Sequence, residues 1–310
     1  MNYNFETITN EWLETKKLSV KYSSYLKYEN IIIKQINPYF HNISIEDIND
    51  NIVIQFFSVK MNNENLSNSY LRTIKYVLSS VFDLAKESIH TINIHWKKIK
   101  IPKSNKTLNV LTNENREYLI QYCRDNKTSL ATGILLSLYS GMRIGEICAL
   151  KWKNVNLETN IITVDATVQR LKTKDNISSK TSLMLCNPKT ETSHRLIPMP
   201  LFLSNYLESF KNTINNEDYV LSNDDIIFDP RRLQKQFKNL CQSYGFTTNF
   251  HNLRHSFATE CVMENIEIKS LSEILGHSSV SITLDLYVHS SMEHKRKEMM
   301  KMKTPLQFAE

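Results

Sequence analysis

Apolar residues recur at steps of three and four along the first hundred residues, which is the spacing of one buried helix face. The segments that show it are Phe5 to Leu18, Val20 to Tyr39, Ile45 to Met61 and Leu66 to Ile89. The last segment carries one apolar stripe, made of Tyr70, Ile74, Val77, Leu78, Val81 and Leu84. Because such stripes are buried against neighbouring helices, this part of the chain is predicted to be a small helical bundle.

The pattern changes after a basic stretch that contains a proline and lacks helical periodicity, Trp96 to Leu108. We interpret this stretch as a linker whose lysines either lie along a phosphate backbone or are simply solvated. Favoured N-cap residues then predict two helices, from Thr112 to Asp125 and from Thr128 or Ser129 to Ser140.

Short β-rich segments come next, at Ile161 to Val168, Ser182 to Cys186 and His194 to Ile197. The polar stretch Lys172 to Lys180 between them is predicted to be a flexible loop. Helical spacing resumes at Pro200 to Thr213, Pro230 to Gly245, Phe250 to Asn265 and Ile268 to Leu275. The expected class is therefore mainly α with one small antiparallel β-sheet.

The length of 310 residues suggests two domains, each large enough for its own core. The net charge is +6, from 38 basic and 32 acidic residues, and the excess is spread over both parts of the chain. Such a mild excess permits nucleic-acid binding without proving it. The motifs must carry any functional claim.

The remaining composition points to a cytoplasmic protein that is not in the membrane. The cysteines are odd in number and lack metal-ligand spacing, so reduced thiols are expected at Cys123, Cys148, Cys186, Cys241 and Cys261. The first ten residues are polar and contain no leader pattern, and the apolar run Gly133 to Tyr139 is too short to span a bilayer.

Several candidate catalytic residues lie near the C-terminal end, between His251 and Tyr287. His251 and Arg254 are three residues apart, so on a helix they project from the same face. Gly276 is expected to end a helix, and His277 lies at the corner before a new helix that Ser278 or Ser279 can cap. Protonatable groups in this arrangement, with a tyrosine beyond them, would suit a phosphodiester site.

The exact order of residues in this stretch is more specific than the chemical types of its side chains. The sequences His251-Asn252-Leu253-Arg254-His255-Ser256-Phe257-Ala258-Thr259 and Leu275-Gly276-His277-Ser278-Ser279, followed by Tyr287, resemble the second signature box of the tyrosine recombinases, the phage-integrase family. The run Ser140-Gly141-Met142-Arg143-Ile144-Gly145-Glu146-Ile147-Cys148-Ala149-Leu150 resembles the first box. Between them, Asn187-Pro188-Lys189-Thr190 and His194-Arg195-Leu196-Ile197-Pro198 resemble the family's lysine-bearing β-hairpin.

The resemblance covers residues 110–290 well and the first hundred residues only in pattern. It implies a helical core-binding, DNA-clamping domain at 1–95, a basic linker at 96–110, a catalytic domain at 111–290 and a tail at 291–310. The tail, which is rich in charge and methionine, would contact a neighbouring protomer in a homotetramer on double-stranded DNA, or else be disordered.

The resemblance also implies roles for individual residues. Tyr287 would attack the scissile phosphate to give a 3′-phosphotyrosyl link, while Arg143 and Arg254 neutralise the phosphate oxygens. His251 would take the phenol proton and His277 would bind a phosphate oxygen. Lys189, on the hairpin, would protonate the leaving 5′-oxygen. The chemistry requires no cofactor, and the sequence shows neither a metal-ligand pattern nor a phosphate-binding glycine loop.

Other polar residues near the motifs have less specific interpretations. Glu146 is expected to support the site, and a salt bridge to it is the structural alternative for Arg143. His255 is interpreted as a structural or supporting residue. Arg195 and Arg231 are expected to make surface or backbone contacts.

We therefore predict a site-specific recombinase that integrates or excises a mobile element. The stretch Thr167-Val168-Gln169-Arg170 and the lysine hairpin resemble integrases of phages and conjugative elements. Many such integrases carry an extra N-terminal arm-binding domain, whereas this sequence is expected to start with the core-binding helices, a departure that weakens the subtype. A chromosome-dimer-resolving recombinase or a cassette-type integrase stays open. A type IB topoisomerase and a non-catalytic DNA-binding relic are further alternatives. Accessory DNA-bending proteins are possible partners.

Overall fold

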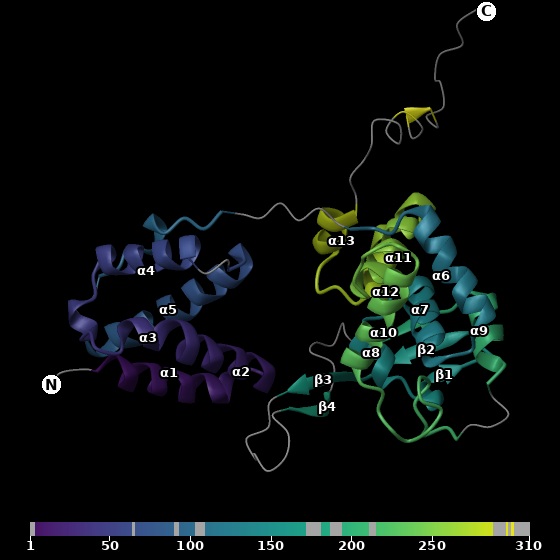
Figure 1. Ribbon diagram of the computed structural model, residues 1–310, viewed down its shortest axis with the longest axis horizontal. Coiled ribbons are helices and arrows are strands. Elements are labelled where there is room, and N and C mark those ends of the chain that lie inside the picture. Colours follow the sequence, from purple (N-terminus) through teal and green to yellow (C-terminus); the bar gives the residue numbers. More distant parts are fainter. Residues whose placement is uncertain are drawn as a thin grey trace, which may run out of the picture. The chain divides into compact units, whose positions relative to one another are not determined.

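A computed structural model describes residues 4–63, 66–89, 93–102, 109–171, 181–186, 194–210, 215–287, 296 and 299–300. The chain divides into two compact units, Met1–Lys106 and Thr107–Glu310, which are labelled by their helices and strands in Figure 1. Each unit has its own buried core, so each is described separately.

The first unit is helical, as predicted. Its helices are α1 (Phe5–Ser19), α2 (Tyr22–Ile31), α3 (Asn37–Phe40), α4 (Asp50–Asn63) and α5 (Asn68–Ser88). A π-helical turn, Ile32–Ile36, joins α2 to α3, so the predicted second segment is helical almost throughout. The third segment begins with a short 3₁₀ turn, Ile45–Asp47, and α4 starts only at Asp50.

The core of this unit forms where the stripe of α5 meets aromatic side chains of α5 and of the other helices. Ile74, Val77, Leu78 and Val81 are fully buried, which confirms the centre of the predicted stripe. The buried aromatic side chains around them are Phe5, Trp12, Phe40, Phe56 and Phe82. Rings in contact of this kind contribute packing energy beyond the area that they bury.

The first part of the predicted linker packs on this bundle rather than running free. The Trp96 ring meets the Phe82 ring edge-on at a centroid distance of 5.7 Å, and Ile99 is 6% exposed. Lys75 Nζ donates to the Ile99 carbonyl oxygen at 2.8 Å, so this lysine is engaged within the unit. An indole and a buried isoleucine thus anchor the stretch to α5.

The second unit combines helices with short strands. Its helices are α6 (Asn113–Asp125), α7 (Ser129–Ser140), α8 (Ile144–Ala149), α9 (Leu201–Glu208), α10 (Pro230–Ser243), α11 (His251–Met263), α12 (Ile268–Leu275) and α13 (Val280–Tyr287). Its strands are β1 (Val155–Asn156), β2 (Ile161–Val164), β3 (Thr167–Leu171), β4 (Ser182–Cys186) and β5 (Arg195–Pro198). The mainly helical class with small antiparallel sheets is confirmed.

The strands form two sheets, whereas the sequence predicted one. β2 pairs with β1 and β5, and β3 pairs with β4, all antiparallel. The predicted strand Ile161 to Val168 is broken at Asp165, which belongs to neither β2 nor β3. Its carboxylate accepts a hydrogen bond from Asn154 Nδ2 at 2.8 Å. Among the described residues, β5 therefore pairs with β2 and β4 with β3. The lysine-bearing segment Asn187-Pro188-Lys189-Thr190 of the expected hairpin lies outside the described residues.

Helix α7 is the central element of the second unit. Ten of its residues are buried, and it packs against α6, α8, α9, α10 and α11. Thr128 caps its start, since Thr128 Oγ1 accepts from the Ala131 amide at 3.2 Å, as predicted. Gly141 ends it in the left-handed conformation, with a φ of 64°. Gly276 ends α12 in the same way, with a φ of 63°, as predicted.

No helix among the described residues is both long enough and apolar enough to cross a membrane.

Gly141 is also a point of close packing, which gives a test of the fold. A Cβ atom there would lie 2.6 Å from Phe257 Cδ1 and 2.9 Å from Leu275 Cδ2. We expect Gly141→Ala to destabilise the second unit by the left-handed strain of about 1–2 kcal/mol plus an overpacking cost of about 1–3 kcal/mol. Hydrogen exchange of the α7 amides under mild denaturant measures this unit separately from the other.

Gly245→Ala is the matched control. Gly245 is also left-handed, with a φ of 80°, but a Cβ atom added there would meet nothing within 4 Å. This variant should show the backbone strain alone. Equal losses in the two variants would contradict the steric role of Gly141.

Candidate active site

The two signature boxes come together where α7, α11 and α12 meet. Arg143 occupies the N-cap position of α8, directly after the Gly141 turn. His251 and Arg254 lie in the first turn of α11, and His277 follows the glycine that ends α12. Tyr287 is the last residue of α13, and its side chain lies outside the described part of the structure. Lys189 also lies outside the described residues.

Arg254 is almost completely buried, with 2% of its surface exposed. Its Nη1 donates to the Gly141 carbonyl oxygen at 2.6 Å, and its Nη2 donates to the Leu275 carbonyl oxygen at 2.7 Å. One guanidinium therefore joins the C-terminal ends of α7 and α12, which places it beside Arg143 and His277.

Arg143 is held by Glu146 and by the end of α12. Its Nη1 donates to Glu146 Oε1 and its backbone N–H to Glu146 Oε2, both at 2.9 Å. Its Nη2 donates to the Gly276 carbonyl oxygen at 3.1 Å. The salt bridge considered as the structural alternative is therefore present. It does not enclose the residue, because 37% of the Arg143 side chain stays exposed to solvent.

Arg195 belongs to this cluster, which the sequence did not predict. Only 7% of its surface is exposed, and its Nη2 lies 2.8 Å from Glu146 Oε2 while its Nη1 lies 3.1 Å from Oε1. The expected surface contact was wrong in this respect, although Nε does donate to a backbone oxygen, that of Ile274, at 2.6 Å. The missed signal was the two-residue spacing of Arg195 and Ile197 in a predicted strand, which puts both side chains on the same face. In the structure this face of β5 is buried.

Glu146 is the carboxylate that Arg143 and Arg195 share. Burial raises its pKa, but hydrogen bonds and charge from Arg195 and then Arg143 outweigh burial and hold that pKa at about 2. The carboxylate is therefore ionised at neutral pH. With Arg254, the cluster holds three guanidinium groups and this one negative charge, so it keeps a positive potential that suits an anion such as a phosphate.

The histidines lie beside this positive charge. Burial and the charges of Arg254, Arg143 and Arg195 lower the pKa of His277 to about 4, and its Nδ1 lies 2.8 Å from Thr283 Oγ1 of α13. The His251 ring meets the His255 ring edge-on at 4.6 Å.

Partial burial, then the neighbouring His255, Arg254 and Arg143, lower the pKa of His251 to about 4. Because His251 is also in contact with solvent, hydration moderates this lowering. Burial and Arg254 lower the pKa of His255 as well. At neutral pH the imidazoles are uncharged, and a neutral imidazole can accept a proton.

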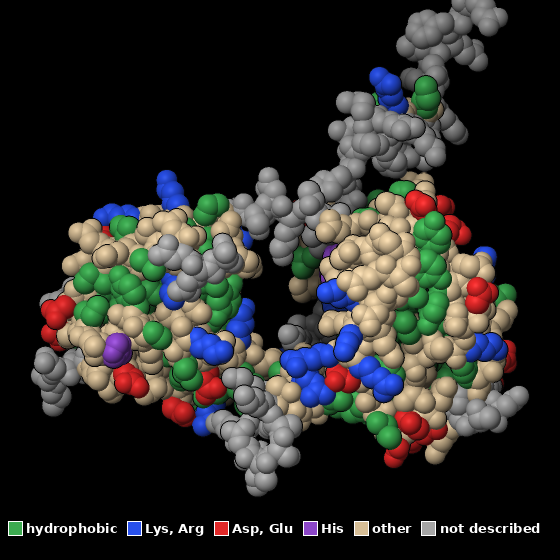
Figure 2. All heavy atoms as spheres, in the orientation of Figure 1, with side chains coloured by type: hydrophobic (Ala, Val, Ile, Leu, Met, Phe, Trp, Pro, Cys, Tyr) green, Lys and Arg blue, Asp and Glu red, His purple; other side chains and the backbone are tan. Residues whose placement is uncertain are grey.

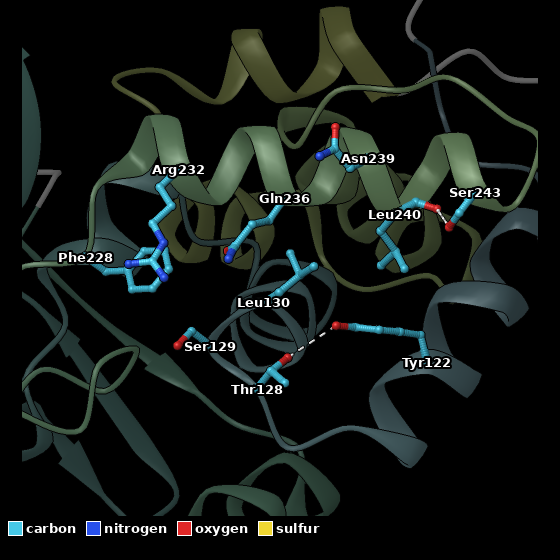
Figure 3. Close-up of a pocket in the computed structure, with 10 residues that line it drawn as sticks. All are labelled: Tyr122, Thr128, Ser129, Leu130, Phe228, Arg232, Gln236, Asn239, Leu240 and Ser243. Carbon is cyan, nitrogen blue, oxygen red and sulfur yellow. Dashed lines mark hydrogen bonds between the residues drawn. The ribbon is translucent and has the colours of Figure 1, made fainter.

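No group of three or more His, Cys, Asp or Glu side chains within the described ranges is placed to hold a metal ion. A separate open pocket of about 490 Å³ lies among α6, α7 and α10, and none of the predicted catalytic residues lines it (Figure 3). The Arg232 guanidinium covers the Phe228 ring there, 5.1 Å from its centroid, and Tyr122 Oη lies 3.4 Å from Thr128 Oγ1.

Comparison with known proteins agrees with the geometry. Residues 109–294 match the phage integrase family, and residues 4–61 match the N-terminal SAM-like domain of phage integrases. The chain is 26% identical to the tyrosine recombinase XerC-like protein of Caldanaerobacter subterraneus subsp. tengcongensis, over 93% of this chain and 81% of that protein. It is also 26% identical to the ICEBs1 integrase of Bacillus subtilis, over 96% of this chain and 81% of that one.

Solved structures share the fold. The Tn1549 transposon integrase, in complex with transposon right end DNA, aligns with a TM-score of 0.80 at 19% identity and covers 96% of this chain and 99% of that one. A lambda integrase dimer bound to a COC′ core site aligns with a TM-score of 0.68 at 15% identity, over 99% of this chain and 81% of that one. Since the family match spans more than half of its length, the chain belongs to the phage integrase family and is a tyrosine-type site-specific recombinase, an enzyme that transfers DNA strands.

Proposed function

We propose that this recombinase integrates and excises a mobile DNA element, cutting and rejoining each strand through a 3′-phosphotyrosyl intermediate. The observation that carries the proposal is the convergence of Arg143, Arg254 and His277 on one positively charged site. Planar guanidinium groups bind two phosphate oxygens at once, which suits the charge that develops during phosphoryl transfer.

In the proposed reaction, the Tyr287 oxygen attacks the scissile phosphorus and the bond to the 5′-oxygen breaks. His251 accepts the phenol proton, and Lys189 gives a proton to the leaving 5′-oxygen, which becomes the free 5′-hydroxyl. Arg143 and Arg254 stabilise the non-bridging oxygens, with His277 as a further hydrogen-bond donor. The reverse reaction with another 5′-hydroxyl rejoins the strand, so no external energy source or metal is needed.

The position of α13 supports Tyr287 as the nucleophile. Thr283, in the middle of this helix, is fully buried and lies within hydrogen-bonding distance of His277. This contact fixes the helix that ends at Tyr287 to the arginine cluster. A helix end is a sound place for a residue that must approach and leave a phosphate, because helix ends fray more readily than helix centres.

Relatives of two kinds bear on the choice between a mobile-element role and a chromosomal role. The similarity to the ICEBs1 integrase favours an integrase, as does a 25% identity over 212 residues to the transposase of transposon Tn916 from Enterococcus faecalis. The similarity to the XerC-like recombinase favours a chromosome-dimer-resolving enzyme as the second candidate. Covalent-complex formation can be measured on DNA from the two ends of an adjoining mobile element and on DNA from the chromosomal terminus. Cleavage of the first kind of DNA indicates the mobile-element role, and cleavage of the second indicates the chromosomal role.

We further propose that helix α10 contacts the DNA backbone. Its apolar face is buried, and its exposed face contains Arg231, Lys235 and Lys238 with no acidic residue anywhere in the helix. Figure 2 shows Lys and Arg side chains gathered over the area in which Figure 1 places β3, α8 and α10. A positively charged helix face on the unit that contains the arginine cluster would hold the duplex through its phosphates.

Assembly and location follow from the proposed reaction. Exchange between two duplexes needs four cuts, so we propose a homotetramer on DNA with the 291–310 tail contacting a neighbouring protomer. Lambda integrase has been seen as a tetramer bound to a Holliday junction, with a TM-score of 0.66 to this chain. The proposed domain roles are DNA clamping by residues 1–95 and catalysis by residues 111–290, in the cytoplasm.

Tyr287→Phe tests the proposed nucleophile. The variant lacks the attacking oxygen, so it should form no covalent complex with a nicked suicide substrate while its DNA affinity stays near that of the wild type. Denaturing gels measure the covalent complex, and fluorescence anisotropy measures binding. Tyr244→Phe, at an exposed tyrosine of the same unit, is the control and should form the complex normally. A covalent complex with Tyr287→Phe would show that another group attacks.

Lys235→Ala and Lys238→Ala test the proposed α10 contact. Each variant should flatten the dependence of log K on log salt concentration by about 0.9 if one phosphate contact is lost. Anisotropy titrations at several salt concentrations give this slope. Lys153→Ala is the control, because Lys153 is neutralised by Glu217 at 2.9 Å and should not change the slope. An unchanged slope in both α10 variants would exclude the contact.

A further inference from the structure

Arg195 and Glu146 form a buried ion pair that stability alone does not explain. Their side chains are 6% and 7% exposed, and each guanidinium Nη faces one carboxylate oxygen. Buried pairs of this kind often contribute little net stability, because removing both charges from water costs about as much as their attraction returns. The position of the pair within the site suggests another role.

Each oxygen of Glu146 is shared between two arginines. Oε1 accepts from Nη1 of Arg143 at 2.9 Å and from Nη1 of Arg195 at 3.1 Å. Oε2 accepts from the Arg143 backbone N–H at 2.9 Å and from Nη2 of Arg195 at 2.8 Å. Four bonds in fixed directions prevent the carboxylate from turning, and Arg143 is bound to that carboxylate. The orientation of Arg143 therefore depends on Arg195.

The same guanidinium also fixes the strand β5 to helix α12. Arg195 Nε donates to the Ile274 carbonyl oxygen at 2.6 Å, and the next two carbonyl oxygens, of Leu275 and Gly276, accept from Arg254 and Arg143. In sequence, Arg195 comes six residues after Lys189. It thus joins β5 to the end of α12.

We propose that Arg195 is a positioning residue for strand cleavage, which holds Glu146 so that Arg143 is correctly oriented towards the scissile phosphate. This role rests on the proposed function. Arg195 also sets the charge of the site, because its positive charge balances Glu146 and leaves that of Arg143 available for phosphate. Without it, Glu146 and Arg143 would form a neutral pair.

The role predicts a change in the pH profile of cleavage. The groups that face Glu146 are Arg195 and Arg143, and together they keep its carboxyl ionised well below neutral pH. A carboxyl whose pKa is lowered in the folded protein stays ionised above that pKa. Without Arg195, burial is opposed by Arg143 alone, so the Glu146 pKa rises, and the pKa of His277, which the charge of Arg195 also lowers, rises with it. Both changes move the acid limb of the cleavage rate to higher pH.

The experiment is single-turnover cleavage of a nicked suicide substrate at saturating protein, across a pH series, with Arg195→Met. We expect near-normal DNA affinity, a rate constant lowered about 100-fold by misplacement of Arg143, and an acid limb at higher pH. Arg195→Lys should return the acid limb to low pH but restore the rate only in part, because an ammonium cannot bind both oxygens in a planar fork.

Arg116→Met is the matched control. Arg116 also forms a two-pronged pair with a glutamate, Glu260, in the same unit, but touches neither Glu146 nor Arg143. Its rate constant and pH profile should match the wild type, even where its stability is lower. A purely structural role of Arg195 would reduce the fraction of active molecules and leave the rate constant and the acid limb unchanged.

Wild-type rate constants and pH profiles in Arg195→Met and Arg195→Lys would overturn the proposed role of Arg195 alone. If Arg195→Met does not fold, Arg195→Lys decides, since a full rate in that variant contradicts the need for a two-pronged contact. Wild-type protein that forms no covalent complex would overturn the proposed function, and the role of Arg195 in cleavage with it.

Discussion

Three guanidinium groups bind three successive carbonyl oxygens at the C-terminal end of α12, and the arrangement of the site depends on these contacts. The donors are Arg195, Arg254 and Arg143, and the acceptors are Ile274, Leu275 and Gly276 in the same order. A helix C-terminus carries partial negative charge, so cations are stabilised there. The contacts hold these three arginines, which come from distant positions in the sequence, beside His277. The carboxylate of Glu146, shared by Arg143 and Arg195, neutralises only one of the three positive charges.

The packing of the second unit makes this convergence possible. Helix α7 is buried on nearly every side, so its end has a fixed position, and the left-handed Gly141 turns the chain towards Arg143. Phe257 and Leu275 fill the space over that glycine, which brings α11 and the end of α12 close enough for Arg254 to bind the Gly141 oxygen. A positive site built in this way is formed before any substrate arrives, which lowers the reorganisation needed during reaction.

The sequence predicted the helices, and it pointed to Arg143, Arg254 and His277, which the structure brings together, because these signals are local. The apolar stripe around Val77, the Thr128 cap and the Gly276 stop each depend on neighbouring residues, and the structure confirms them. The two sheets were not predicted, because a break at Asp165 changes the pairing partner without changing the apolar pattern. The burial of Arg195 was missed because its partner, Glu146, is distant in sequence and charge alone suggests a surface position.

The most direct test of the account is to identify the attacking residue by mass spectrometry on unaltered protein. The protein is incubated without added metal with suicide substrates drawn from DNA beside its own coding sequence, and the covalent product is digested. We predict one modified peptide, linked through Tyr287 to a 3′-phosphate at one discrete DNA position. A link through another residue would contradict the account, and links at many DNA positions would indicate a topoisomerase instead.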